Sequence, residues 1–332
     1  MKEFLAFVKR NSLGKCLENE SLKKYTTYKA GGTARVIFYP KNIRSLTSAV
    51  QYLREHKIRH LVLGYGSNVL FSDDTYEGVI IKLDEFNKIT FFKNKIRVGA
   101  GYSLMRLARD AAKRGLTGLE FAAGIPGSVG GAIYMNAGAY RSDMGYITTK
   151  VKVLTSEYQV ITMVNKELDF HYRKSFFQTH KDYIVLEATI ALTEGKKEAI
   201  LAVMEDRKKR RLESQPLEYP SAGSVFRNPP DVPAGKLIDD LHLKGLQKGD
   251  AAVSSKHANF IINLGSAKAS DIRDLILFVH DAVEENYGYD LKIEQEFINW
   301  ENLDEDNEKS ESSHIKEEVK EDNEKEKEDN QN

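Results

Sequence analysis

The sequence is poor in cysteine and in long apolar runs. Cys16 is the only cysteine of the 332 residues, so the chain can form neither an internal disulfide nor a cysteine metal cluster, and we expect no metal site. Cys16 lies in a mixed, helical-looking segment, where we predict a structural role for it. No apolar stretch of about eighteen residues occurs, and residues 1–10 lack the core of a signal peptide. These absences predict a cytoplasmic protein without membrane insertion.

Large apolar side chains are also scarce in residues 301–332. This stretch holds 14 acidic against 5 basic side chains, a net charge of −9, and the preceding 300 residues therefore carry +9 in a chain of zero formal charge. So little apolar surface cannot offset the entropy that ordering would cost. We predict a disordered acidic tail at 301–332 and leave it out of the fold.

The positive charge of the remaining chain is densest in "RKKRR", residues 207–211. It can be interpreted as the solvated last turn of a helix, favoured by the helix dipole, as a phosphate-binding patch, or as a nucleic-acid contact. The first interpretation is favoured, because Ile200, Leu201 and Met204 recur at helical spacing just upstream. We expect no nucleic-acid partner.

Strand and helix patterns alternate in the first part of the chain. Residues 43–55 predict an amphipathic helix between two strand patterns, and residues 103–115 predict a second helix after the strand "KIRVGAG". From 150 to 193 the β-branched segments follow one another without helices, which predicts antiparallel strands.

Five of the seven prolines fall in residues 214–235, and this loop-rich stretch leads into a further domain. There we predict a long helix that begins at Ser270 and Asp271 as N-cap and stops at Gly288, followed by a last strand at 291–300. The whole pattern indicates an α+β protein in at least two lobes.

No dinucleotide fingerprint and no Walker loop is present. The segment 64–68, "GYGSN", follows a strand, so its main-chain amides can form a nest for phosphate oxygens. Val69 stands where the fingerprint needs its third glycine, and Gly-Lys-Ser/Thr does not occur. Taken alone, an ordinary β turn is the simpler interpretation of this segment.

A second glycine-rich segment, "GIPGSVGGAIYMNAGAY" at 124–140, changes that balance. Glycine loses the most entropy on folding, so such a cluster indicates close main-chain approach or positive φ. Two glycine-rich loops in one domain suit a long ligand with a diphosphate and a flat ring. Flavin adenine dinucleotide (FAD) is the leading hypothesis.

The sequence resembles the UDP-N-acetylenolpyruvoylglucosamine reductase (MurB) family, type II branch. The resemblance rests on blocks that occur in the expected order over about residues 20–298: "YTTYKAGGTA", "GYGSNVLFSD", "GLEFAAGIPGSVGGAIYMNAGAY", "YRKSFF", "SAGSVFRNP", "AGKLIDDLHLKG", "VSSKHANFIIN" and "YGYDLKIEQEF". It implies an FAD-binding region of the vanillyl-alcohol-oxidase type in two α/β subdomains, followed by an α+β substrate-binding domain. We place these at 1–195 (subdomains about 20–83 and 84–195) and 196–300.

The resemblance further implies that NADPH reduces a non-covalently bound FAD, which reduces the enolpyruvyl ether of a UDP-sugar to UDP-N-acetylmuramate for peptidoglycan synthesis. Three residues match the family's catalytic positions. Arg173 suits a carboxylate with its planar fork, Ser224 matches the proton donor, and Glu294 matches an acidic partner that a desolvated site would keep protonated.

The same resemblance and the two loops nominate binding residues. The predicted cofactor-binding set is Gly64, Tyr65, Gly66, Ser67, Asn68, Gly124, Ile125, Pro126, Gly127, Ser128, Gly131, Asn136, Ala137 and Gly138. The predicted substrate-binding set is Tyr172, Arg211, Arg227 and Asn228, in which either arginine could hold the UDP diphosphate.

Two other functions remain open at this stage. One is a different FAD-dependent oxidoreductase of the same fold, such as an alcohol oxidase that attaches flavin through a histidine, although residues 64–68 contain no histidine. The other is a binding module whose nests hold a nucleotide without chemistry. A flavin spectrum and its response to NADPH separate these alternatives.

We predict that deletion of residues 303–332 leaves steady-state turnover unchanged, because the tail lacks apolar anchors. The measurement is NADPH consumption by the shortened and full-length proteins at equal flavin content. A large loss of turnover would show that the tail docks on the folded chain.

Overall fold

The computed structural model describes residues 1–300, and the predicted tail at 301–332 lies outside the described residues. The chain forms two compact units, each built from separate stretches. Unit 1 comprises Met1–Thr27, Thr33–Ser67 and Thr75–Leu217, and unit 2 comprises Tyr28–Gly32, Asn68–Asp74 and the chain from Glu218 onward. This division falls at 217/218, whereas the sequence suggested a boundary at 195/196. Which ligand each part binds stays a prediction.

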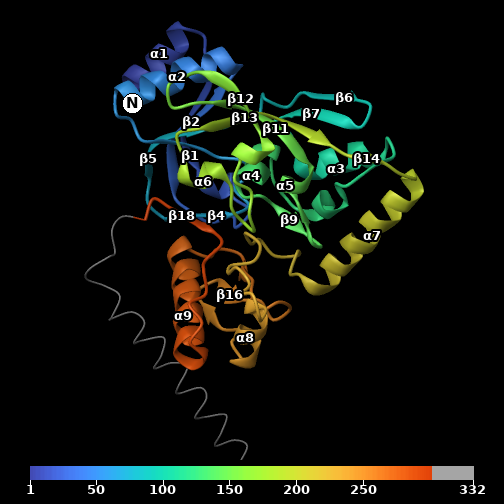
Figure 1. Cartoon of the computed structure of the whole chain (residues 1–332). Helices are drawn as coiled ribbons and strands as arrows, with labels where there is room; N and C mark the ends of the chain where they lie inside the picture. Colours follow the sequence, from blue (N-terminus) through green and yellow to red (C-terminus); the bar gives the residue numbers. More distant parts are fainter. Residues whose placement is uncertain (301–332) are drawn as a thin grey trace, which may run out of the picture. The chain divides into compact units, whose positions relative to one another are not determined.

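The first sheet of unit 1 combines parallel and antiparallel pairing (Figure 1). Its order is β1 (Gly14–Ser21), β2 (Thr33–Pro40), β5 (Tyr76–Ile81) and β3 (His60–Val62). Strand β1 is antiparallel to β2, and β5 runs parallel to both of its neighbours. Helices α1 (Lys2–Arg10) and α2 (Ile43–Glu55) belong to the same unit, and the bounds predicted for α2 are confirmed. The Asn42 side chain accepts a hydrogen bond from the Ser45 amide at 3.0 Å and caps α2.

The helical prediction for the segment around Cys16 is wrong. Cys16 lies in β1 opposite Phe38 of β2, half-buried, and its neighbour Leu17 pairs with Ile37. A single sequence window does not contain the partner strand, and the partner decides this conformation. Burial raises the pKa of the Cys16 thiol to about 11, which keeps it protonated and is consistent with a structural role.

The second sheet of unit 1 is antiparallel throughout, as the β-branched segments predicted. Its order is β12 (Val160–Val164), β11 (Thr148–Leu154), β13 (Ile184–Ala191), β7 (Lys95–Gly99) and β6 (Ile89–Phe92). Helix α3 (Leu104–Ala112) is capped by the side chain of Ser103, and α7 (Lys197–Ser214) carries "RKKRR" near its end. Shorter elements complete the unit: η1 (Leu22–Lys24), β8 (Leu116–Thr117), η2 (Glu120–Gly124), α4 (Val129–Tyr134), β9 (Gly138–Ala139), β10 (Ser142–Asp143), α5 (Met144–Ile147), η3 (Asn165–Glu167), α6 (Phe176–Thr179) and β14 (Thr193–Glu194). The mixed α+β class is confirmed.

Unit 2 has its own core beneath α9 (Ala269–Tyr287), which packs against the sheet β15 (Gln247–Lys248), β16 (Ala251–Val253) and β17 (Ile261–Asn263). Helix α8 (Ala234–Asp240) and the parallel pair β4 (Val69–Phe71) and β18 (Glu296–Ile298) complete it (Figure 1). The strand predicted at 291–300 is thus only three residues long. Residues 292–294 are extended alongside residues 225–227 instead, with a single bridge between Phe226 and Ile293.

The N-cap predicted for α9 is also wrong, although its stop at Gly288 is confirmed by a left-handed φ of 71°. The helix begins two residues earlier than Asp271, at Ala269. The Asp73 carboxylate, from the stretch between β4 and β5, accepts hydrogen bonds from the amides of Ala269 and Ser270 and from the Ser270 hydroxyl, each at 2.9 Å. A residue distant in sequence therefore satisfies the first N–H groups of the helix.

Within residues 1–300, no helix combines the length and the apolar composition that a membrane span requires.

We predict that Asp73→Ala lowers the free energy of unfolding by about 1–2 kcal/mol, because three donors at the start of α9 lose their acceptor. Urea denaturation of the two proteins measures the change. The exposed neighbour Asp74 supplies the control, since Asp74→Ala removes a carboxylate without touching α9. Equal stability of the Asp73 and Asp74 variants would contradict the capping role.

Candidate functional site

The two glycine-rich loops of unit 1 lie against each other. The Ser67 hydroxyl donates a hydrogen bond to the Pro126 carbonyl at 2.6 Å. A Cβ added to Gly64 would approach the Ser128 Oγ to 2.7 Å, whereas one on Gly127 would meet only the Ser67 Oγ, at 3.8 Å. The main chain at Gly127 is therefore open to a flat or phosphorylated ligand, while Gly64 is needed for contact between the loops.

Other glycines of these loops serve the protein's own packing. Gly66 has a φ of 63°, and a Cβ there would lie 2.1 Å from the Tyr25 carbonyl oxygen. The Ser128 side chain accepts a hydrogen bond from the Gly131 amide at 3.2 Å and caps α4, so this part of the segment predicted as a loop is a short helix. Ala137 and Gly138 continue into the β9–β10 hairpin.

Lys82 is a cation at the first loop that the sequence analysis missed. The residue is 6% exposed, and its ammonium donates to the Gly64 carbonyl and lies 3.6 Å from the Asp84 carboxylate. Burial lowers the Lys82 pKa. Tyr65 of the same loop lies with its ring 6.0 Å from this ammonium. The only feature of the sequence that could have indicated this residue is a lysine directly after the apolar residues 79–81.

Arg211, near the end of α7, packs on the second loop. Its side-chain atoms lie 2.9–3.3 Å from the position a Cβ on Gly124 would take. The described residues give its guanidinium one hydrogen-bond partner, Gln215 Oε1 at 3.1 Å, and no carboxylate. Burial lowers the pKa of Arg211. A half-buried cation that packs on a glycine-rich loop and has no counter-ion among the described residues fits the binding of an anionic cofactor such as FAD.

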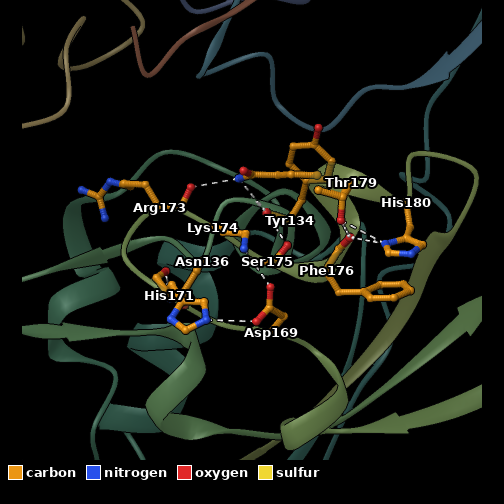
Figure 2. A network of polar contacts seen from close by, with 11 residues as sticks. Tyr134, Asn136, Asp169, His171, Arg173, Lys174, Ser175, Phe176, Thr179 and His180 are labelled. Atoms are coloured by element: carbon orange, nitrogen blue, oxygen red, sulfur yellow. Dashed lines mark hydrogen bonds and ion pairs between the residues drawn. The ribbon is translucent and has the colours of Figure 1, made fainter. Parts of the chain in front are cut away.

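Arg173 occupies the tip of a tight turn. His171 and Lys174 exchange both main-chain hydrogen bonds, at 3.0 and 3.1 Å, with Tyr172 and Arg173 between them. Arg173 has a φ of 54°, a conformation that costs a non-glycine residue roughly 1–2 kcal/mol. In Figure 2 the Arg173 side chain extends away from the surrounding polar network. Its guanidinium lies 5.2 Å from the Tyr172 ring, which is 57% exposed.

Asn136 holds this turn to the glycine-rich segment. Its Nδ2 donates to the His171 carbonyl at 2.7 Å, and its Oδ1 accepts from the Gly145 amide at 2.8 Å. Asn136 is 2% exposed and has a φ of 43°, which asparagine tolerates better than most residues. The Ser175 hydroxyl adds a 2.6 Å bond to the Tyr134 carbonyl (Figure 2). The side chain of Asn136, predicted to bind the cofactor, thus bonds to the protein main chain.

In unit 2 the segments that carry Ser224 and Glu294 run side by side. The Glu294 amide donates to the Val225 carbonyl at 2.7 Å, and the Arg227 amide donates to the Lys292 carbonyl at 2.9 Å. The structure therefore brings two of the three predicted catalytic residues onto adjacent main-chain segments of one unit. Arg173 belongs to unit 1.

Asn68 and Glu296 extend this arrangement. The Asn68 side chain donates to the Glu294 carbonyl at 3.0 Å, and the Asn68 carbonyl accepts from the Glu296 amide at 2.9 Å. Glu296 is a second partly exposed carboxylate, two residues after Glu294 on the same extended segment. Asn68, predicted as a cofactor ligand, thus also fixes the main chain between these carboxylates.

The predicted substrate residues of unit 2 differ in exposure. Arg227 is half-buried, and its Nε has no hydrogen-bond partner among the described residues. A buried donor without an acceptor is costly unless a ligand supplies one. Asn228 is exposed, and its Oδ1 accepts from the Ala234 amide at 3.0 Å at the start of α8.

Comparisons with known proteins cover both units. A model of the C-terminal domain of UDP-N-acetylenolpyruvoylglucosamine reductase matches residues 215–298, and an FAD-binding-domain model matches residues 34–163. UDP-N-acetylenolpyruvoylglucosamine reductase 1 of Bacillus cereus is 43% identical over 287 residues, which are 86% of this chain and 95% of that protein. The corresponding reductase of Bacillus licheniformis is 42% identical over 299 residues, 90% of this chain and 99% of that protein.

A solved structure gives the same result. The crystal structure of UDP-N-acetylenolpyruvylglucosamine reductase from Thermus caldophilus aligns with a TM-score of 0.72 and 36% identity. The alignment covers 86% of this chain and 98% of the Thermus chain. Sequence and structure comparisons thus agree over nearly the whole length of the relatives.

We predict that Asn136→Ala lowers the free energy of unfolding by about 1–3 kcal/mol, because the partly buried Gly145 amide loses its acceptor and the His171 carbonyl loses one of its two donors. Thermal and urea unfolding measure the loss. Asn136→Asp provides the comparison, since it keeps the acceptor for Gly145 and tolerates positive φ but removes the donor to His171. If Ala and Asp are both neutral, Asn136 does not hold the turn.

Proposed function

Because the chain belongs to the UDP-N-acetylenolpyruvoylglucosamine reductase family and is an FAD-dependent oxidoreductase, we propose that it reduces the enolpyruvyl group of UDP-N-acetylglucosamine enolpyruvate to UDP-N-acetylmuramate. NADPH is the proposed hydride donor, and the proposed setting is cytoplasmic peptidoglycan precursor synthesis. The observation that carries the proposal is the 43% identity to the Bacillus cereus reductase, which spans 95% of that protein.

FAD, when bound, supplies a two-electron relay between NADPH and the sugar substrate. The residues that would hold it are the main chain of the two loops, Ser67, and the cation Arg211 beside Gly124. The charge of Arg211 and its place on the glycine-rich segment favour a flavin contact over the UDP contact suggested by the sequence. Lys82 supports the first loop through its bond to the Gly64 carbonyl, while Asp84 offsets its charge.

The substrate residues have separate proposed tasks. Addition of a hydride to the enolpyruvyl methylene carbon leaves an electron pair on the neighbouring carbon, delocalised into the carboxylate. Arg173 pairs with that carboxylate and stabilises the added charge. The Ser224 hydroxyl then donates its proton to the carbon that bore the electron pair, which completes the saturated ether. Glu294 is the proposed acidic partner of the enol-like oxygen.

Ser224 is suited to this task by its place on the chain. It follows Gly223, whose φ of 80° and open surroundings leave space on that side of the main chain. Its own side chain is partly exposed, whereas Val225 and Phe226 after it are buried. A hydroxyl held at the edge of a packed segment can meet a ligand without local unfolding.

We predict that purified protein binds FAD, that NADPH bleaches the flavin anaerobically, and that the UDP-enolpyruvyl sugar restores its colour. Ser224→Ala should leave bleaching by NADPH unchanged and slow reoxidation by the sugar by orders of magnitude. Stopped-flow absorbance of the two half-reactions measures both rates. Equal slowing of both half-reactions would contradict the proton-donor role.

The same assay distinguishes the roles of the two neighbouring carboxylates, Glu294 and Glu296. Glu294→Gln should slow reoxidation far more than Glu296→Gln, if Glu294 is the acidic partner. The reverse result would move that role to Glu296. A flavin reduced by NADPH that oxygen, but not the sugar, reoxidises would instead indicate a different oxidoreductase of this fold.

A further inference from the structure

The main chain around Ser224 lacks the support of regular secondary structure. Between Ser214 at the end of α7 and Ala234 at the start of α8 the described chain forms no helix or multi-residue strand. Its pairing with the segment before β18 is a single bridge, at Phe226. Main-chain bonds join Val225 and Arg227 to neighbouring segments, and the amides and carbonyls that these bonds leave unpaired need partners on side chains. Two buried amide side chains, Asn259 and Gln295, provide them.

Asn259 forms hydrogen bonds with the main chain directly after Ser224. Its Oδ1 accepts from the Phe226 amide at 2.9 Å, and its Nδ2 donates to the Phe226 carbonyl at 2.8 Å. Its own carbonyl accepts from the Val225 amide at 3.0 Å. The side chain thus pairs with Phe226 as a neighbouring β-strand would, and it is 3% exposed.

Gln295 contacts the chain on the other side of the same serine. Its Nε2 lies 3.4 Å from the carbonyl oxygens of Ala222 and Gly223 and 3.5 Å from that of Ser224. These are long, shared contacts. Three consecutive carbonyls therefore converge on one buried NH₂ group, and Gln295 is 5% exposed.

Each amide has a neighbour that fixes its place. The Tyr28 hydroxyl donates to Gln295 Oε1 at 3.0 Å, which turns Nε2 toward the three carbonyls. Burial raises the pKa of Tyr28, so the hydroxyl keeps the proton it donates. The main-chain amide of Asn259 donates to His257 Nδ1 at 3.2 Å, and burial lowers the pKa of His257 and keeps that nitrogen an acceptor.

We propose that Asn259 and Gln295 are positioning residues that hold the Ser224 hydroxyl in place for proton donation. Neither residue is proposed to contact the substrate. Both act through the main chain on the two sides of Ser224. The inference rests on the proposed function, because it assumes that Ser224 is the donor. Proton transfer is sensitive to such placement, since an error of about 1 Å can cost roughly 100-fold in rate.

The bonding pattern explains why both residues are amides. Each bridges main-chain or hydroxyl donors and carbonyl acceptors inside unit 2, and an amide offers a separate acceptor oxygen and a two-proton donor without a charge. A carboxylate in place of Gln295 would repel three carbonyl oxygens, and a lysine in place of Asn259 would leave the Phe226 amide without an acceptor. Neutral anchors also leave the electrostatics of the hydroxyl to the residues around the substrate.

The test is a double-variant cycle read in the two half-reactions. Gln295→Met and Asn259→Ala, each with bound FAD, should be reduced by NADPH within about twofold of the unmodified protein. Their reoxidation by the UDP-enolpyruvyl sugar should slow about 10- to 100-fold. In a Ser224→Ala background, neither substitution should slow reoxidation further, because there is no hydroxyl left to position.

Two further variants make the result decisive. Tyr28→Phe removes only the hydroxyl that orients Gln295, so it should reproduce part of the Gln295→Met effect even if that variant or Asn259→Ala does not fold. Asn299→Gly is the matched control: Asn299 is a buried amide of the same unit, bonded to Ser72 Oγ at 3.1 Å, with a φ of 66° that suits glycine. It should lower stability and leave the ratio of the half-reactions unchanged.

The outcomes separate the two levels of inference. If the unmodified, NADPH-reduced protein is not reoxidised by the sugar, the proposed function and the positioning roles both fall. If it is reoxidised but the substitutions add their full effect to Ser224→Ala, or slow both half-reactions equally, only the positioning roles fall. Loss of their effect in the Ser224→Ala background supports them.

Discussion

The irregular main chain at each candidate residue has to find hydrogen-bond partners that a helix or a sheet would otherwise supply. Short amide side chains, buried or half-buried, meet this need at three places among the described residues. Asn136 joins the turn that carries Arg173 to the Gly145 amide in α5. Asn259 pairs with the segment after Ser224 as a neighbouring strand would. Asn68 does the same for the chain that carries Glu294. The main chain that carries the candidate residues is thus held by neutral amide side chains.

Regular elements could be read from the sequence where the local pattern decides the conformation. Helix α2 has the predicted bounds, because its apolar spacing and the Asn42 cap lie within a few residues of each other. The antiparallel sheet from β11 to β13 also follows from local β-branched composition. Cys16 and the start of α9 were misjudged, since a distant strand fixes the first and Asp73 caps the second. Such partners are invisible in a sequence window.

Some features of the candidate site could likewise be predicted from the sequence, and others could not. The glycine-rich loops were found by their composition, and the structure brings Ser67 against Pro126, yet it also uses Gly66 and Ser128 for the protein's own packing. The resemblance to the family nominated Arg173 and Ser224, because ordered blocks carry information that no single residue does, and their roles stay predictions. Lys82 was missed, since one lysine at the end of an apolar strand has no distinctive pattern. Contacts, and not residue type, distinguish it from a surface lysine.

Unit 2 is assembled from three stretches of chain, and this has a consequence for dissecting the molecule. A fragment that starts at Glu218 would contain Ser224, Glu294 and Gln295 but would lack Tyr28 and the strand β4 that pairs with β18. Exchange of carboxyl-terminal halves between relatives would likewise separate the chain from Glu218 onward from the two short stretches of unit 2 that precede it in the sequence. Compatibility between such chimeras is therefore decided at residues 28–32 and 68–74, although both stretches lie within the matched range of the FAD-binding model or just before it.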